Sequence, residues 1–187
     1  MKQQISRFIF SLKTKKHTKR QKQFMNYSDI HNVLLLFESS LNEKNPYINS
    51  IAKQLENDGK KVTLCGFLDK KNSDQLVLPD FYIIDHSKIN FFSEPKKEFI
   101  SSLLYKKFDI VLDLTLNETL PLQYILMYAK APFKVGRKIT NCNLLDFMID
   151  LKTNGIIENI GSSRYVSQIS YLLEQIIFYL KSIKSHI

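Results

Sequence analysis

Apolar and polar positions follow two different rhythms along the chain. Near the N-terminus, Ile5, Phe8, Ile9 and Leu12 recur every three or four residues, which predicts a short amphipathic helix with these side chains on one face. From residue 32 onward, continuous apolar runs, typical of strands, alternate with stretches whose apolar residues recur at helical spacing. Strands are expected at 33–37, 61–68, 81–84, 108–114, 133–136 and 147–151, and helices at 46–55, 95–104, 118–129 and 162–183.

Strict alternation of strands and helices predicts βαβ units, because two parallel strands need a long crossover connection. We therefore expect an α/β fold: a small, doubly wound, mostly parallel sheet of five or six strands, Rossmann-like, with helices on both faces. The continuous apolar run 33–37 fits a strand covered on both sides. A chain of 187 residues has room for one such domain, which we place at 29–187, after a basic helix and arm at 1–28.

The positive charge of the chain is concentrated at its start. The whole sequence carries 27 Lys and Arg against 18 Asp and Glu, a formal charge of +9. Residues 1–28 hold eight of the basic residues and none of the acidic ones, so the rest of the chain is nearly neutral. The cluster 13–22 follows the predicted helix, and it either extends that helix or forms a flexible arm that orders on a polyanion.

This basic cluster predicts an anionic partner. Cations at this density neutralise phosphates and release counterions, so the leading hypothesis is binding to RNA or a ribonucleoprotein, with the ribosome as the expected example. Phe8, Phe10 and Phe24 are available to stack on exposed bases. The residues predicted to contact phosphate are Lys13, Lys15, Lys16, Lys19, Arg20 and Lys22.

Three other interpretations of the N-terminal segment stay open. One is a solvated segment with no specific partner. Another is a peripheral membrane anchor, in which the apolar face of the helix enters the lipid interface while the lysines meet anionic head groups. The third is an organellar transit peptide, which is also basic, amphipathic and free of acids. A secretory signal is not indicated, because Arg7 interrupts the apolar stretch and a Lys cluster follows it.

A second candidate site lies at the carboxyl edge of the predicted sheet, where open parallel sheets bind ligands. Glu38 follows the first strand and Asp113 the fourth, and both are candidate catalytic carboxylates. A carboxylate at Asp113 would act as a base or hold a ribose hydroxyl; the alternative is that Asp113 and Asn117 cap the next helix. The other polar residues expected in this crevice are Ser39, Ser40, Asp85, Thr115 and Asn117.

The sequence offers little that would hold a cofactor or a metal. Its five glycines form neither a dinucleotide-binding nor a P-loop pattern, and its four histidines lack metal-binding spacing. Cys65 and Cys142 have apolar neighbours, so we expect reduced, buried thiols in a cytoplasmic protein. No apolar run approaches the roughly 18 residues that span a bilayer. We therefore expect no cofactor and no metal, and a non-catalytic protein is favoured over an enzyme.

The stretch 108–137, FDIVLDLTLNETLPLQYILMYAKAPFKVGR, resembles a segment in the N-terminal domain of glycosyltransferase family 9, the heptosyltransferase-like enzymes. The resemblance implies half of a two-domain GT-B architecture and a sugar-phosphate or nucleotide ligand. Those enzymes carry a Gly-Asp pair after the first strand; the loop 38–43 lacks it, which leaves Glu43 as the candidate replacement. The whole chain is also similar to short uncharacterised proteins of Bacteroidetes that join a Lys-rich N-terminus to a half-sized α/β domain.

Three functional hypotheses follow from these observations. The first is a non-catalytic α/β protein that contacts RNA or a ribonucleoprotein through its basic arm. The second is a glycosyltransferase-related enzyme or a binder of sugar phosphates or nucleotides, with its ligand at the carboxyl edge. The third is a peripheral membrane protein.

Overall fold

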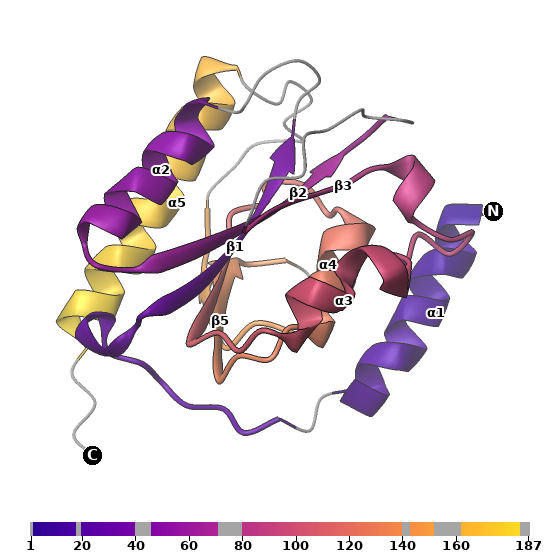
Figure 1. Cartoon of the computed structure of the whole chain (residues 1–187), viewed down its shortest axis with the longest axis horizontal. Coiled ribbons are helices and arrows are strands. Elements are labelled where there is room, and N and C mark those ends of the chain that lie inside the picture. The colour runs from indigo at the N-terminus through magenta and orange to yellow at the C-terminus, as the bar shows by residue number, and fades with distance from the viewer. Residues whose placement is uncertain are drawn as a thin grey trace.

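Six apolar runs form the strands of one parallel sheet in the computed structural model of the chain (Figure 1). The strands lie in the order β3-β2-β1-β4-β5-β6, and every neighbouring pair is parallel. This confirms the predicted doubly wound α/β fold. The structure describes residues 2–17, 20–39, 46–70, 80–139, 143–151 and 162–183. The strand bounds are β1 Asn32–Ser39, β2 Lys61–Leu68, β3 Phe81–Ile84, β4 Ile110–Asp113, β5 Phe133–Arg137 and β6 Phe147–Ile149.

Strand β1 is the centre of the sheet. It pairs with β2 on one side and with β4 on the other, so the chain order runs outward in both directions from this strand. Seven of its eight residues are buried, as expected for a strand covered on both faces. Because all the strands are parallel, their carboxyl ends meet at one edge, and the gap between β1 and β4 is the point where the strand order reverses.

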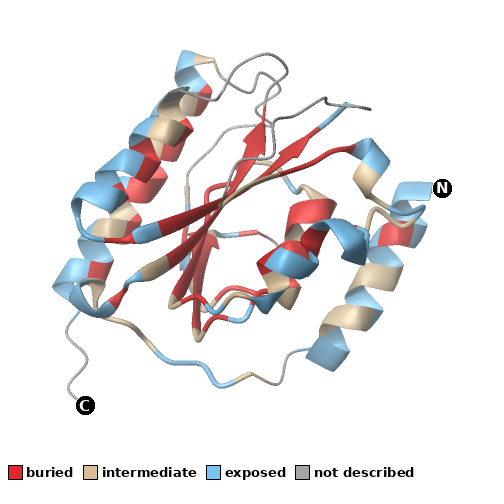
Figure 2. Ribbon diagram, in the orientation of Figure 1, coloured by how far each residue is buried: buried red, intermediate tan, exposed pale blue. Residues whose placement is uncertain are grey.

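Two helices cover each face of the sheet. Figure 1 shows α2 and α5 on one side and α3 and α4 on the other, and Figure 2 shows the burial of the strands between them. Helix α2 ends where Gly59 adopts a φ of +77°, a conformation that favours glycine. Helix α5 begins where the Ser162 hydroxyl accepts a hydrogen bond from the Tyr165 N–H. The helix bounds are α2 Pro46–Asn57, α3 Lys97–Tyr105, α4 Leu120–Tyr128 and α5 Ser163–Ser182.

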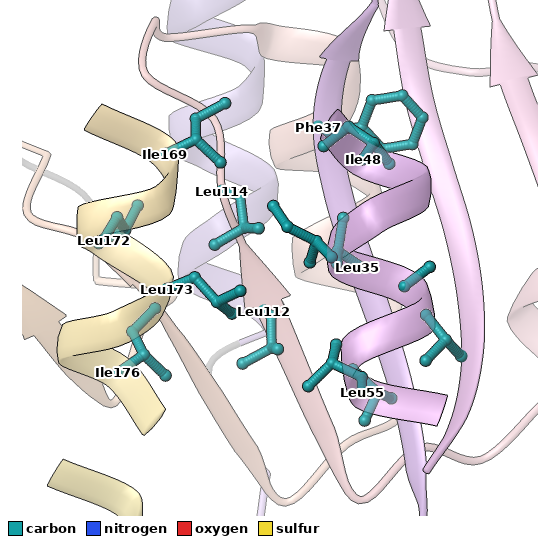
Figure 3. Close-up of a cluster of buried hydrophobic side chains, with 14 of the residues drawn as sticks. Leu35, Phe37, Ile48, Leu55, Leu112, Leu114, Ile169, Leu172, Leu173 and Ile176 are labelled. Atoms are coloured by element: carbon teal, nitrogen blue, oxygen red, sulfur yellow. The ribbon is translucent and has the colours of Figure 1, made fainter. Parts of the chain in front are cut away.

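The core consists of two apolar clusters, one on each side of the sheet. Alternate residues of β1 divide between them: Leu35 joins the cluster under α2 and α5, while Leu34 joins the cluster under α3 and α4. Helix α5 contributes a stripe at helical spacing that packs over Leu112 of β4 and over Leu114, which lies just after that strand (Figure 3). That stripe consists of Ile169, Leu172, Leu173, Ile176 and Leu180.

The N-terminal helix α1, Lys2–His17, lies outside this arrangement as a further layer against α4 (Figure 1). It is longer than the apolar stripe predicted, because the polar residues up to His17 continue the helix. The first part of the basic cluster is therefore helical. Among the described residues, no helix has the length and apolar character needed to cross a bilayer.

Candidate functional site

The carboxyl edge between β1 and β4 brings together two of the predicted carboxylates. Glu38 lies near the end of β1 and Asp113 at the end of β4, where Asp113 is in register with Leu36 of the neighbouring strand. Both residues are only 3% exposed. Two acidic groups withdrawn from water require hydrogen-bond partners, so the identity of those partners decides what this edge can do.

Glu38 receives its hydrogen bonds from the protein itself. Its carboxylate accepts from the Leu116 N–H at 3.1 Å, the Asn117 N–H at 3.1 Å and the Thr119 hydroxyl at 3.2 Å. The Tyr165 hydroxyl of α5 donates to it at 2.9 Å. Burial and the nearby Glu38 charge raise the pKa of Tyr165, so this phenol stays protonated and remains a donor. Glu38 thus joins β1, the loop after β4 and α5, and it is already occupied as an acceptor.

Asp113 closes a local turn. Its carboxylate accepts from the Thr115 N–H at 3.1 Å and the Thr115 hydroxyl at 2.7 Å. Burial raises the pKa of Asp113 to about 6, and the Glu38 charge adds to this, while the two Thr115 hydrogen bonds and the Arg137 charge oppose it. Gly136 of β5 packs closely beside it, since a Cβ there would lie 2.7 Å from the Asp113 carbonyl oxygen.

Asp113 does not cap the following helix, because its carboxylate accepts from Thr115. The N-cap residue of α4 is Thr119, whose side chain makes no capping hydrogen bond. The backbone N–H groups of Leu116 and Asn117 point to Glu38 instead. The loop after β4 is therefore held by a carboxylate from the neighbouring strand.

The remaining crevice candidates have local roles or fall outside the described residues. Asp85 is buried and accepts from the Ser87 N–H and hydroxyl at 2.8 and 2.5 Å, which caps the short 3₁₀ helix His86–Lys88. Ser39 is buried at the end of β1, Thr115 is buried beside Asp113, and Asn117 is half-buried. Ser40 and Glu43 lie outside the described residues. An open hollow of about 560 Å³ lies elsewhere, beside α2 and β2, and neither Glu38 nor Asp113 lines it.

Metal-ligating side chains do not gather in the part of the chain that the structure describes: it contains no group of three or more His, Cys, Asp or Glu residues placed to hold an ion. Cys65 is a buried free thiol, and burial raises its pKa to about 12, so it is protonated and unreactive at neutral pH. Cys142 lies outside the described residues.

The second candidate, helix α1, is fixed to the body by aromatic and ionic contacts. The Phe10 ring meets the Tyr124 ring of α4 edge to face, with centroids 4.8 Å apart. The Lys13 ammonium donates to Glu94 Oε2 at 2.6 Å. At the opposite flank, Arg7 pairs with Glu118 at 2.8 Å. Helix α1 is thus docked on the domain.

The rest of the basic cluster continues this attachment. Arg20 donates to the Pro132 carbonyl oxygen at 2.7 Å and forms an ion pair with Asp146. Lys22 reaches the same carboxylate at 3.2 Å. Of the six residues predicted to contact phosphate, Lys13, Arg20 and Lys22 therefore have carboxylate partners within the fold. Lys15 and Lys16 are exposed on α1, and Lys19 lies outside the described residues.

One face of α1 holds the predicted apolar stripe of Ile5, Phe8, Ile9 and Leu12, but this face points away from the domain. Ile5 is 43% exposed, Phe8 64% and Leu12 45%. Ser6, by contrast, is buried and faces the body together with Phe10. The helix therefore docks through a mixed face and presents its most apolar face to solvent. Figure 2 shows that most of α1 is exposed or half-buried.

A model of the DUF6913 family, a family of unknown function, matches residues 2–162. The chain belongs to this family. The match to the DUF6913 family covers α1 and all six strands and ends just before α5. The basic helix is therefore part of the DUF6913 region. No curated protein matches the chain, and no solved structure matches it.

Sequence patterns alone miss two features of the chain. The first is the Tyr165 hydroxyl on Glu38, which joins residues 127 positions apart and leaves no local signal. The second is the orientation of α1, which depends on Glu94 and Tyr124 far along the chain. The sequence does contain one indication that Glu38 has partners within the fold. Glu38 directly follows the uninterrupted apolar run 33–37, where a charged side chain is expected to be buried and paired.

Proposed function

We infer that this protein is a non-catalytic binding protein that contacts a phosphate-bearing polyanion through α1. The observation that carries this proposal is an acid-free helix, fixed to the domain by one face, that presents lysines to solvent from the other. RNA or a ribonucleoprotein is one such partner, and an anionic lipid surface is another, since both present phosphodiesters.

Two further observations support a binding role for α1. The helix is held by its own contacts to Glu94, Glu118 and Tyr124, so its exposed side chains are already positioned. It also lies within the family match, which favours a part of the domain over a cleavable transit peptide. A preordered surface loses less conformational entropy on binding than a flexible arm does.

A glycosyltransferase-related enzyme, or a binder of sugar phosphates or nucleotides, is supported less well. Residues 108–137, which carry the likeness to glycosyltransferase family 9, form β4, α4 and β5, an arrangement common to α/β sheets. Glu38 accepts four hydrogen bonds from the protein, so it offers little capacity as a general base. The likeness to short proteins of Bacteroidetes agrees with a small domain that has a Lys-rich start, and it names no activity.

The test measures binding of the full chain to two probes: a fluorescein-labelled RNA hairpin, and vesicles of phosphatidylcholine with 30% phosphatidylglycerol. We expect binding to at least one probe, with affinity that falls as salt rises from 50 to 300 mM. Lys15→Gln/Lys16→Gln removes two exposed cations from α1 and should weaken binding roughly tenfold. The matched control, Lys53→Gln/Lys61→Gln, removes two exposed cations from α2 and β2 and should leave binding nearly unchanged.

Two results would overturn this proposal. One is the absence of binding to both probes at 50 mM salt. The other is equal weakening in the two double variants, because the response would then follow total charge and α1 would have no special part in it.

A further inference from the structure

We propose that the outer face of α1 docks on an anionic lipid membrane. This inference rests on the function proposed above and names its partner. Membrane docking assigns a role to Ile5, Phe8 and Leu12. The folding of the domain does not require these apolar side chains to be exposed. The helix would lie in the plane of the interface, with the α/β domain on its water side.

The apolar side chains form a continuous stripe. Starting at Ile5, steps of four and three residues lead through Ile9 to Leu12, and Phe8 lies beside this line. Three of the four side chains are more than two-fifths exposed, and Ile9 is half-buried. An interfacial helix inserts an exposed apolar stripe of this kind among the acyl chains of a membrane.

Lysines lie at both ends of the stripe. Lys2 is three residues before Ile5, and Lys16 is four residues after Leu12, so both continue the same line along the helix. Lys2 also lies over the ring of Phe91, 4.8 Å from its centroid, and Phe91 is itself highly exposed. A membrane-surface helix needs this order, with apolar groups in the middle and long cationic side chains that reach the head groups at the ends.

The two acidic groups that form ion pairs with α1 do not oppose an anionic surface. Glu118 pairs with Arg7, and Glu94 pairs with Lys13 and accepts from the Tyr128 hydroxyl. The helix itself has no acidic residue. These ion pairs lie on the flanks that meet the body, so the cations at the ends of the stripe set the sign of the outer face.

The same observations favour lipid over RNA. Phosphates attract cations, and bases stack on aromatic rings, so RNA accounts for Lys15, Lys16 and Phe8. Neither contact removes an isoleucine or a leucine from water. Ile5 and Leu12 gain from an acyl-chain environment, and they make up much of the exposed apolar face.

The experiment compares two Phe→Ser variants by vesicle flotation. Phe8→Ser alters the outer face of α1, and Phe178→Ser alters a residue of α5 that is 60% exposed, close to the 64% of Phe8. We expect the full chain to float with vesicles that contain 30% phosphatidylglycerol and not with pure phosphatidylcholine. Phe8→Ser should lower the partition coefficient at least tenfold, and Phe178→Ser should leave it unchanged.

A fluorescence measurement reports insertion directly. The chain contains no tryptophan, so Phe8→Trp and Phe178→Trp each introduce a single reporter. Addition of phosphatidylglycerol vesicles should shift the emission of Phe8→Trp to the blue, as an indole does on leaving water, and should not shift that of Phe178→Trp.

The outcomes separate this inference from the function it rests on. Binding to the RNA hairpin without flotation overturns the lipid inference and leaves the polyanion proposal standing. Absence of binding to both probes overturns both. Flotation that Phe8→Ser and Phe178→Ser reduce equally, or equal emission shifts in the two Trp variants, overturns the assignment of the outer face of α1.

Discussion

The carboxyl edge between β1 and β4 and the outer face of α1 leave their side chains in opposite situations. Glu38 is withdrawn from water and accepts hydrogen bonds from two other segments of the chain, the loop after β4 and α5. Phe8 is exposed to water on a helix that also carries exposed lysines. The sheet topology alone predicts a ligand at the carboxyl edge between β1 and β4, yet hydrogen-bond donors of the protein itself occupy Glu38 there. The outer face of α1 exposes large apolar side chains, so partners are better sought there.

The largest expected effect tests the structural role of Glu38. Glu38→Ala leaves two N–H groups, the Thr119 hydroxyl and the Tyr165 hydroxyl without their buried acceptor. Each unsatisfied buried donor is costly, so we expect a loss of roughly 3–5 kcal/mol in the free energy of unfolding, measured by urea denaturation. Glu174→Ala, at an exposed position of α5, is the control, with a change within about 0.5 kcal/mol.

If Glu38→Ala does not fold, Glu38→Gln provides a second test of the structural role of Glu38. It preserves the size of the side chain and one acceptor oxygen, so its stability should lie between those of the wild type and Glu38→Ala. An unfolding free energy of Glu38→Ala within about 1 kcal/mol of the wild type would contradict a structural role for Glu38. The carboxylate would then be free to serve a ligand.

The stability of the folded protein should depend on pH through Asp113, at the same edge of the sheet. Its folded pKa of about 6 lies above the ordinary value of 3.8, so the native state holds this proton more tightly than the unfolded state. The resulting stabilisation is complete below about pH 4 and is lost as pH rises through about 6. Asp113→Asn keeps an acceptor for Thr115 without the charge. Its stability relative to the wild type should therefore rise by roughly 2–3 kcal/mol between pH 4 and pH 8, measured by denaturation at both pH values. A difference that does not change with pH would contradict the buried ionisation.

The sequence predicts the sheet better than it predicts either site. Continuous apolar runs such as 61–68 mark buried strands because both faces of the sheet are covered, and β2 has these bounds. The end of α1 is harder to predict, since polar residues from Lys13 to His17 continue the helix without an apolar pattern. A carboxylate such as Glu38 has partners supplied by other segments, so spacing cannot distinguish a structural acceptor from a catalytic base.

The orientation of α1 shows the same limit. An apolar stripe on a helix usually faces the core, and periodicity finds the stripe without showing which way it points. Here the direction is set by Phe10 against Tyr124 and by Lys13 with Glu94, contacts between residues 81 or more positions apart. A pattern confined to α1 cannot contain that information.

The smallest expected changes in unfolding free energy come from substitutions of two phenylalanines of α1 that lie on different faces of the helix. Phe10→Ala removes the ring that contacts Tyr124, so we expect a loss of about 1–2 kcal/mol in unfolding free energy, less than for a fully buried ring. Phe8→Ala removes an exposed ring, and its loss should stay below about 0.5 kcal/mol. Urea denaturation of both variants, with vesicle binding measured alongside, should show opposite rankings: Phe10→Ala costs more stability and Phe8→Ala more binding. Equal stability losses would mean that Phe8 also packs on the domain, and the difference between a docked face and an available one would disappear.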